Sequence, residues 1–248
     1  MKIAVCVSHV PDTETKVKVG SDGTTIDPSG VNYILNPYDE FAVEEALKIR
    51  DKDGGEVVAV SLGGDANKET LRKALAMGAD KAVLLKSEGD RDSYGVAKGI
   101  AEYLKSYEPD LILVGKQSID HDNSQVGGLV AEFLGMPSVS VVVKLEMQDG
   151  KIAAEREIEG AHEHVEVTLP CVVAAQRGLN DPRYPSLKGI MQAKKKPIEE
   201  IDAAPVESRV RVLAMKKPPE KQPGKIVGEG VDAVPELVRL LREEAKVI

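Results

Sequence analysis

Between residue 2 and about residue 138, short continuous apolar runs alternate with segments of helical periodicity. Because these runs lack a polar residue at every second position, they predict strands that are buried on both faces of a parallel sheet. Strands that alternate with helices indicate a doubly wound, mostly parallel α/β fold of the Rossmann-like type. The predicted strands are 3–7, 57–62, 81–85 and 111–115, and the predicted helices are 39–52, 67–77, 93–107 and a segment from Ser124 or Gln125 to Leu134.

The pattern changes after residue 138. Two apolar runs at 139–147 and 151–158 flank Asp149 and Gly150, a strong hairpin signal, so we expect an added β-hairpin region. Further strands are expected at 165–169 and 171–175.

The C-terminal part of the sequence has a different composition. From about Asp202 onward prolines cluster and apolar runs are few, which is typical of an extended arm, and a helical stripe follows at 233–245. This helix needs a surface to pack on, either on its own domain or on a partner subunit. We therefore expect an α/β nucleotide-binding domain at 1–200 and, at 201–248, an extended arm and helix that pack on a partner.

Composition excludes several classes of protein. The 33 basic and 41 acidic residues give a net charge of −8, which argues against nucleic-acid binding, since that requires a basic face. No run of about 18 apolar residues is present, so direct membrane insertion is not expected. The start of the chain lacks the apolar segment of a signal peptide, which favours a cytoplasmic protein.

The chain has few candidates for catalysis or metal binding. It contains neither a P-loop nor a G-x-G-x-x-G, G-x-S-x-G or H-E-x-x-H motif. Cys6 and Cys171 lie in or beside apolar runs, which favours buried structural thiols. His162 and His164 would share one face of a strand, but without further ligands they are better interpreted as solvent-facing. We predict no catalytic residue and no metal site.

A polar loop from Gly115 to Gly127 is the strongest candidate for ligand binding. It follows a predicted strand and precedes a helix, and in open parallel sheets ligands bind at this position. Asn123 or Ser124 could cap that helix, and free N–H groups at 124–127 would bind an anion such as a nucleotide phosphate. The alternative is an ordinary capped helix after a long loop.

Two further segments are candidates for binding. At 35–40, Leu-Asn-Pro-Tyr-Asp-Glu forms a strand-side loop that ends at the start of a helix, although this pattern is also that of a plain helix boundary. Between 178 and 196, three lysines follow Leu187, Ile190 and Met191. Exposed aliphatic anchors beside lysines would suit docking to an acidic protein, whereas the alternative is a solvated face.

These segments, in this order, resemble the β subunit of electron transfer flavoprotein. The resemblance covers essentially the whole chain, and its last motif is the most specific. The motifs that carry it are Val7-Ser8-His9-Val10-Pro11-Asp12, Asn36-Pro37-Tyr38-Asp39-Glu40, the loop GKQSIDHD at 115–122, and LNDPRYPSLKGIMQAKKK at 179–196.

The resemblance implies an electron carrier rather than an enzyme, in a heterodimer whose α subunit holds most of an FAD. Such a carrier accepts electrons from soluble flavin dehydrogenases, for example the acyl-CoA dehydrogenases of fatty acid oxidation, and passes them to the respiratory chain through a quinone oxidoreductase. The β subunit binds AMP, and Tyr38 and Thr13 would approach the flavin. The residues implied in cofactor binding are Cys6, Asn36, Pro37, Tyr38, Asp39, Leu62, Asp120, His121, Asp122, Asn123, Ser124, Gln125, Val126 and Gly127.

The resemblance also implies a docking segment for the dehydrogenase, in which Leu187 would enter an apolar pocket of the partner. The residues implied in docking are Tyr184, Leu187, Ile190, Met191, Lys194, Lys195 and Lys196.

One alternative concerns the nucleotide of the β subunit. The helix start at 124–126 lacks the threonine of many AMP-binding members, and Gln-Val-Gly at 125–127 is similar to members that hold a second FAD, oxidise NADH and bifurcate its electrons. Those members usually continue with a proline, whereas this chain has Gly128. AMP is therefore preferred over a second FAD.

Overall fold

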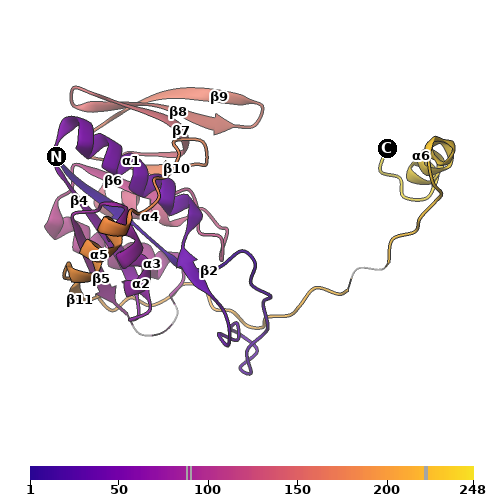
Figure 1. Ribbon diagram of the computed structural model, residues 1–248, viewed down its shortest axis with the longest axis horizontal. Helices are drawn as coiled ribbons and strands as arrows, with labels where there is room; N and C mark the ends of the chain where they lie inside the picture. The colour runs from indigo at the N-terminus through magenta and orange to yellow at the C-terminus, as the bar shows by residue number, and fades with distance from the viewer. Residues whose placement is uncertain (88, 90, 221–222) are drawn as a thin grey trace.

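The computed structural model describes residues 1–87, 89, 91–220 and 223–248. It confirms an α/β protein with a nine-stranded sheet (Figure 1). The strands are β1 (Lys2–Cys6), β2 (His9–Pro11), β3 (Tyr33–Leu35), β4 (Glu56–Gly63), β5 (Lys81–Lys86), β6 (Leu111–Gly115), β7 (Ser138–Gln148), β8 (Lys151–Ile158), β9 (Ala161–Thr168), β10 (Cys171–Ala175) and β11 (Glu199–Asp202). The helices are α1 (Pro37–Asp53), α2 (Asn67–Met77), α3 (Ser93–Tyr107), α4 (Val126–Leu134), α5 (Leu187–Lys195) and α6 (Val234–Glu243), with a 3-10 turn, η1, at Val231–Ala233.

The large sheet is parallel over most of its width. Its strand order is β11-β5-β4-β1-β6-β10-β7-β8-β9, and all pairs from β11 to β7 are parallel. Strands β8 and β9 then extend the sheet in antiparallel pairs, joined to β7 by the two-residue turn Asp149–Gly150. Gly150 has φ +72°, a conformation that glycine adopts without strain. The antiparallel pairing of β7 and β8 confirms the predicted hairpin.

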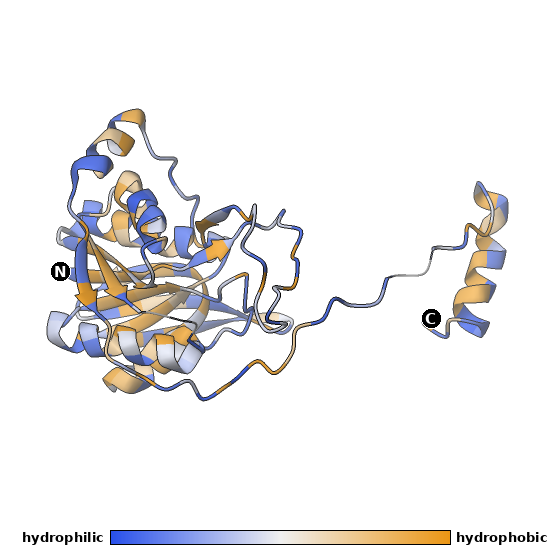
Figure 2. Ribbon diagram, turned by 90° about the horizontal axis from the view of Figure 1, so that it is seen from below, coloured by the Kyte–Doolittle hydropathy of each residue, from blue (hydrophilic) through white to orange (hydrophobic). Residues whose placement is uncertain are grey.

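Helices cover both faces of the parallel strands, as the uninterrupted apolar runs predicted. Alternate residues of β1 enter different core layers: Ile3 and Val5 pack with α1 and α2, whereas Ala4 and Cys6 pack with α3 and α4. Figure 2 shows the hydrophobic strands between these two layers of helices.

Several boundaries and elements differ from the sequence prediction. Helix α1 begins at Pro37, two residues earlier than expected, because proline has the φ of a first helical residue and needs no N–H partner there. Helix α4 begins at Val126. The three-residue strands β2 and β3 and the edge strand β11 were missed, and the docking segment contains an unpredicted helix, α5.

The C-terminal arm leaves the body beside β11. Met215 N–H donates to Gly23 O at 2.7 Å, and beyond this contact the chain continues to α6, which lies apart from the body in Figure 1. No residue of η1 or α6 is buried. The division into domains at residues 200 and 201 stays a prediction. None of the helices described is long and apolar enough to cross a membrane.

Candidate functional site: a cleft at the switch point of the sheet

A cleft of about 590 Å³ opens at the carboxyl ends of the central strands. The chain passes from β1 through α1 to β4 on one side of β1, and it later returns to place β6 on the other side. The sheet therefore has its switch point at β1, and in open α/β sheets this is where ligands bind.

The start of α4 forms one wall of the cleft. The first bond of this helix runs from Leu129 N–H to Gln125 O at 3.0 Å, so the N–H groups of Val126, Gly127 and Gly128 precede the helical ladder. A Cβ at Gly127 would lie 2.8 Å from Val114 Cγ2, so only glycine lets α4 start this close to β6. Free N–H groups at a helix start suit an anion such as a phosphate.

The expectation that Asn123 or Ser124 caps α4 is wrong. Gln125 occupies the N-cap position and makes no side-chain cap bond. Asn123 Nδ2 donates instead to Ser93 Oγ at 2.8 Å, and Ser124 Oγ donates to Gln117 Oε1 at 3.0 Å. Their side chains connect parts of the loop with one another and with α3, and the helix start, at which Val126 and Gly127 line the cleft, has no side-chain cap.

Asp39 lies at the base of the cleft, in the first turn of α1. Its carboxylate accepts hydrogen bonds from Ser8 N–H at 2.7 Å and from Gly115 N–H at 3.0 Å. The side chain is buried, and this desolvation raises the pKa of Asp39 to about 7 despite the bonds it accepts.

Asn36 supports the loop from behind. This fully buried residue donates from Nδ2 to Gln117 O at 2.9 Å and accepts from Ile119 N–H at 3.3 Å. The motif before α1 thus fixes the polar loop that follows β6, although the two are about 80 residues apart in sequence.

Most of the predicted cofactor-binding residues come together at the cleft. Those that line it are Cys6, Asp39, Leu62, Asp120, His121, Asn123, Gln125, Val126 and Gly127. Those outside its lining are Asn36, Pro37, Tyr38, Asp122 and Ser124. Burial raises the pKa of the Cys6 thiol to about 12, so this sulfur is neutral at the cleft floor.

The opposite wall was missed by the sequence analysis. It is formed by Gly63 at the end of β4 and by residues that follow β4 and β5, among them Asn67, Ser87, Arg91 and Ser93. Ser87 Oγ is buried and has no hydrogen-bond partner among the residues described, which suits a ligand group at that point. The position of this wall just beyond two predicted strands is a signal that could have revealed it.

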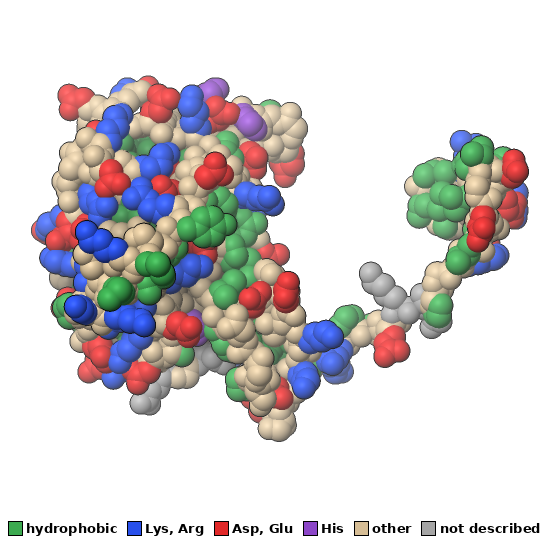
Figure 3. Space-filling view, in the orientation of Figure 1, with side chains coloured by type: hydrophobic (Ala, Val, Ile, Leu, Met, Phe, Trp, Pro, Cys, Tyr) green, Lys and Arg blue, Asp and Glu red, His purple; other side chains and the backbone are tan. Residues whose placement is uncertain are grey.

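The predicted docking residues lie elsewhere on the surface, on and before α5. Tyr184 is 96% exposed, Leu187 83% and Met191 66%. Figure 3 shows hydrophobic side chains among Lys and Arg on this part of the molecule. Lys194 and Lys195 are exposed, whereas Lys196 is half-buried and donates from Nζ to Ala79 O at 2.8 Å.

The histidines of β9 are exposed, as expected. His162 Nδ1 lies 2.5 Å from Glu155 Oε1 across the antiparallel strands. The two cysteines are buried, in agreement with the structural interpretation.

A doubly wound sheet with a cleft at its switch point places the chain in the Rossmann-like class of α/β proteins. Residues 23–206 match the electron transfer flavoprotein domain family. The chain is 42% identical to "Electron transfer flavoprotein subunit beta" of Bacillus subtilis, with all of both chains covered. It is 41% identical to the β subunit of Syntrophomonas wolfei, covering 98% of that protein, and 36% identical to that of Sus scrofa, covering 99%. In both comparisons all of the present chain is covered. The chain therefore belongs to the electron transfer flavoprotein β-subunit family.

Proposed function

We propose that this chain carries electrons as one half of a heterodimer with an electron transfer flavoprotein α subunit. The full-length similarity to proteins named as β subunits supports such a partner. The amphipathic helix α6 also supports it, because none of its residues is buried on this chain. In this role the chain binds cofactors and partners and has no substrate of its own.

We infer further that the cleft at the switch point holds AMP, and this cleft is the observation that carries the proposal. Its volume of about 590 Å³ is within the range of small-molecule sites. The N–H groups of Val126–Gly128 would hold the phosphate, with the Arg91 guanidinium on the facing wall. Ser87 Oγ, which has no hydrogen-bond partner among the residues described, would find one in the ligand.

The FAD, which supplies the redox chemistry when bound, would be held mostly by the α subunit. Tyr38 would approach it from this chain, its ring already covered on one side by Lys116 Nζ at 5.5 Å from the centroid. Soluble flavin dehydrogenases would dock on Leu187 and its neighbours, and a quinone oxidoreductase would receive the electrons.

The test is to denature the purified, co-expressed heterodimer and to quantify the released nucleotides by mass spectrometry. One FAD and one AMP per heterodimer is the expected result. Two FAD and no AMP would replace the proposal by a bifurcating complex in which the cleft holds a redox cofactor and NADH is the donor. If the heterodimer releases neither AMP nor FAD, the result would contradict the assignment of the cleft as a nucleotide site.

A further inference from the structure

The docking segment, residues 183–196, carries its apolar residues on the outside. Within α5 only Ala193 is buried, while Leu187 and Met191 face solvent. An exposed helix of nine residues is not stable on its own. Its position therefore depends on contacts with the rest of the molecule, and polar contacts hold the segment at both of its ends.

The first end is attached to α1 through two buried carboxylates. Arg183 donates from Nε to Glu44 Oε2 at 2.8 Å and from Nη2 to Glu44 Oε1 at 3.0 Å, a two-pronged bond to a side chain that is 7% exposed. Its Nη1 also donates to Asp51 at 3.1 Å. Just before the segment, Asn180 Nδ2 donates to Glu45 Oε2 at 2.8 Å. Planar guanidinium–carboxylate pairs of this kind fix orientation as well as distance.

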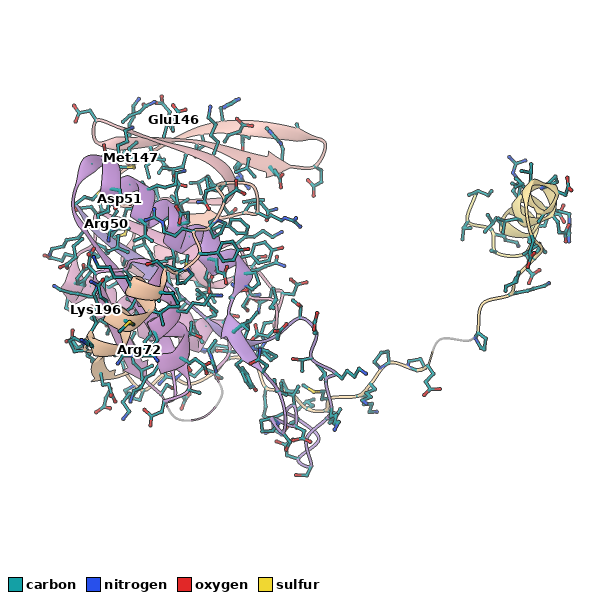
Figure 4. All side chains as sticks on the ribbon, in the orientation of Figure 1. Arg50, Asp51, Arg72, Glu146, Met147 and Lys196 are labelled. Carbon is teal, nitrogen blue, oxygen red and sulfur yellow. The ribbon has the colours of Figure 1, made fainter. Side chains whose placement is uncertain are left out.

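The second end is attached to α2. The Arg72 guanidinium donates to the backbone carbonyls of Ala193 and Lys196, which have no partner inside α5 at its C-terminus. Lys196 Nζ in turn donates to Ala79 O, just beyond α2. Figure 4 shows Arg72 on α2 and Lys196 directly after α5. A Cβ at Gly189 would lie 2.6 Å from Ala76 O, so glycine permits the close approach of α5 to α2.

We propose that Arg183 and Arg72 are positioning residues for electron-partner docking, which hold the docking segment at both ends so that Leu187 is presented in one fixed place. This inference rests on the proposed docking function and explains how Leu187 is held in place for it. Helix α1 carries Asp39 at the cleft and Glu44 at the docking segment, so the same rigid helix relates the two sites. Lys196 belongs to this attachment, whereas Lys194 and Lys195 stay free to attract an acidic partner.

The experiment compares single and double variants of the co-expressed heterodimer. Arg183→Lys keeps a cation beside Glu44 but loses the two-pronged bond, so the buried carboxylate is not left without a partner. The reductant is a purified acyl-CoA dehydrogenase, and kcat and KM for the heterodimer as electron acceptor are measured separately. Arg156→Lys is the matched control, since Arg156 pairs with Glu163 on the antiparallel strands.

We expect Leu187→Ala to lower kcat/KM about 30-fold, as for a central interface anchor. Arg183→Lys should raise KM about tenfold at unchanged kcat, if it leaves the docking conformation populated about one-tenth of the time. In the Leu187→Ala background, Arg183→Lys should raise KM less than about twofold, because Arg183 acts through the position of Leu187. Arg72→Lys should behave like Arg183→Lys, and Arg156→Lys should leave both constants unchanged.

Two outcomes separate the claims. If Leu187→Ala slows transfer but Arg183→Lys and Arg72→Lys do not, or if their effects simply multiply with that of Leu187→Ala, the positioning role is overturned and docking stands. If Leu187→Ala has no effect, docking at this segment is overturned, and the positioning role with it. The paired change Glu44→Gln with Arg183→Gln repeats the test without a buried charge, should the lysine variant assemble poorly.

Discussion

The backbone N–H of Gly115, at the end of β6, donates a 3.0 Å hydrogen bond to the carboxylate of Asp39 in the first turn of α1. The second carboxylate oxygen accepts from Ser8 N–H, just beyond β1. One side chain therefore joins two strand ends and a helix start at the cleft. A Cβ on Gly115 would lie 2.3 Å from Asp39 Oδ1, so this junction also requires the glycine.

The first prediction concerns pH and follows from the burial of Asp39. The pKa of this carboxyl is about 7 in the folded protein and 3.8 as the ordinary value, so between these values the folded state retains a proton that the unfolded chain loses. The contribution of Asp39 to the free energy of unfolding is thus full below about pH 4 and is lost as the pH rises to about 7, with a slope of at most about 1.4 kcal/mol per pH unit. Denaturant unfolding of the heterodimer at several pH values measures it.

Asp39→Asn is the variant that isolates this contribution. Asp39→Asn should make the free energy of unfolding less dependent on pH between 4 and 7. At low pH it should lower this free energy by about 1–3 kcal/mol, because an amide NH₂ then faces one of the two N–H donors. Asp12→Asn is the control: its carboxyl has a lowered pKa, set first by the bond from Glu14 N–H, and titrates below this window. An unchanged slope in Asp39→Asn would contradict the assignment.

Two adjacent glycines of α4 provide the second prediction. Alanine at 127 would bring its Cβ to 2.8 Å from Val114 Cγ2, whereas alanine at 128 meets open space. We expect Gly127→Ala to destabilise the protein by about 1–3 kcal/mol and to reduce the bound nucleotide, since the helix start must shift. Gly128→Ala should stabilise the protein by about 0.5–1 kcal/mol through helix propensity and should retain the nucleotide. Equal nucleotide content in the two variants would argue against phosphate binding at this helix start.

The third prediction uses the difference between the two cysteines. Burial raises the pKa of both thiols to about 12, so neither should react readily with iodoacetamide at pH 7.5. Cys6 lines the cleft and Cys171 does not. Removal of the nucleotide should therefore accelerate alkylation of Cys6 alone, as followed by peptide mass spectrometry. Equal acceleration at both thiols would indicate general loosening of the fold instead.

A fourth prediction separates the three consecutive lysines. The double variant Lys194→Gln, Lys195→Gln should slow reduction by the dehydrogenase at low ionic strength and weaken its salt dependence, because both side chains are exposed. Lys196→Gln should instead lower the unfolding temperature, because it removes the bond to Ala79 O. The result that would contradict this division is a change in salt dependence from Lys196→Gln alone.

The sequence predicts those parts of the molecule in which local pattern and tertiary burial agree. The central strands are buried on both faces, and α3 has strong periodicity and the side-chain cap Asp92, so their bounds agree with the structure within one or two residues. Helix α5 was missed because Leu187 and Met191 face solvent, and because its contacts with Arg183 and Arg72 join segments that are far apart in the sequence. Strands β2 and β3 have three residues each, too few for a period to register.

The candidate site could be predicted only in part, because only one of its walls has a local sequence pattern. The loop after β6 contains a recognisable motif and lies after a predicted strand. The facing wall with Ser87 and Arg91 has no such pattern, and its relation to the cleft depends on strand order. Asn36 illustrates the limit: the motif was found, but its bonds to Gln117 O and Ile119 N–H, behind the cleft, required the fold.

The last prediction concerns the arm. Its first part is attached to the body, since Asp92 accepts hydrogen bonds from the N–H groups of Arg209 and Val210, and Arg91 donates to Ala204 O. A chain that ends after residue 212 keeps these contacts and loses η1 and α6, which contain no buried residue. We expect it to fold with an unfolding temperature close to that of the full chain but to associate weakly with the α subunit in size-exclusion chromatography. A chain that ends after residue 202 also loses the contacts of Arg91 and Asp92 beside the cleft, so it should release its nucleotide more readily. If the chain that ends after residue 212 forms the heterodimer normally, α6 has no part in assembly.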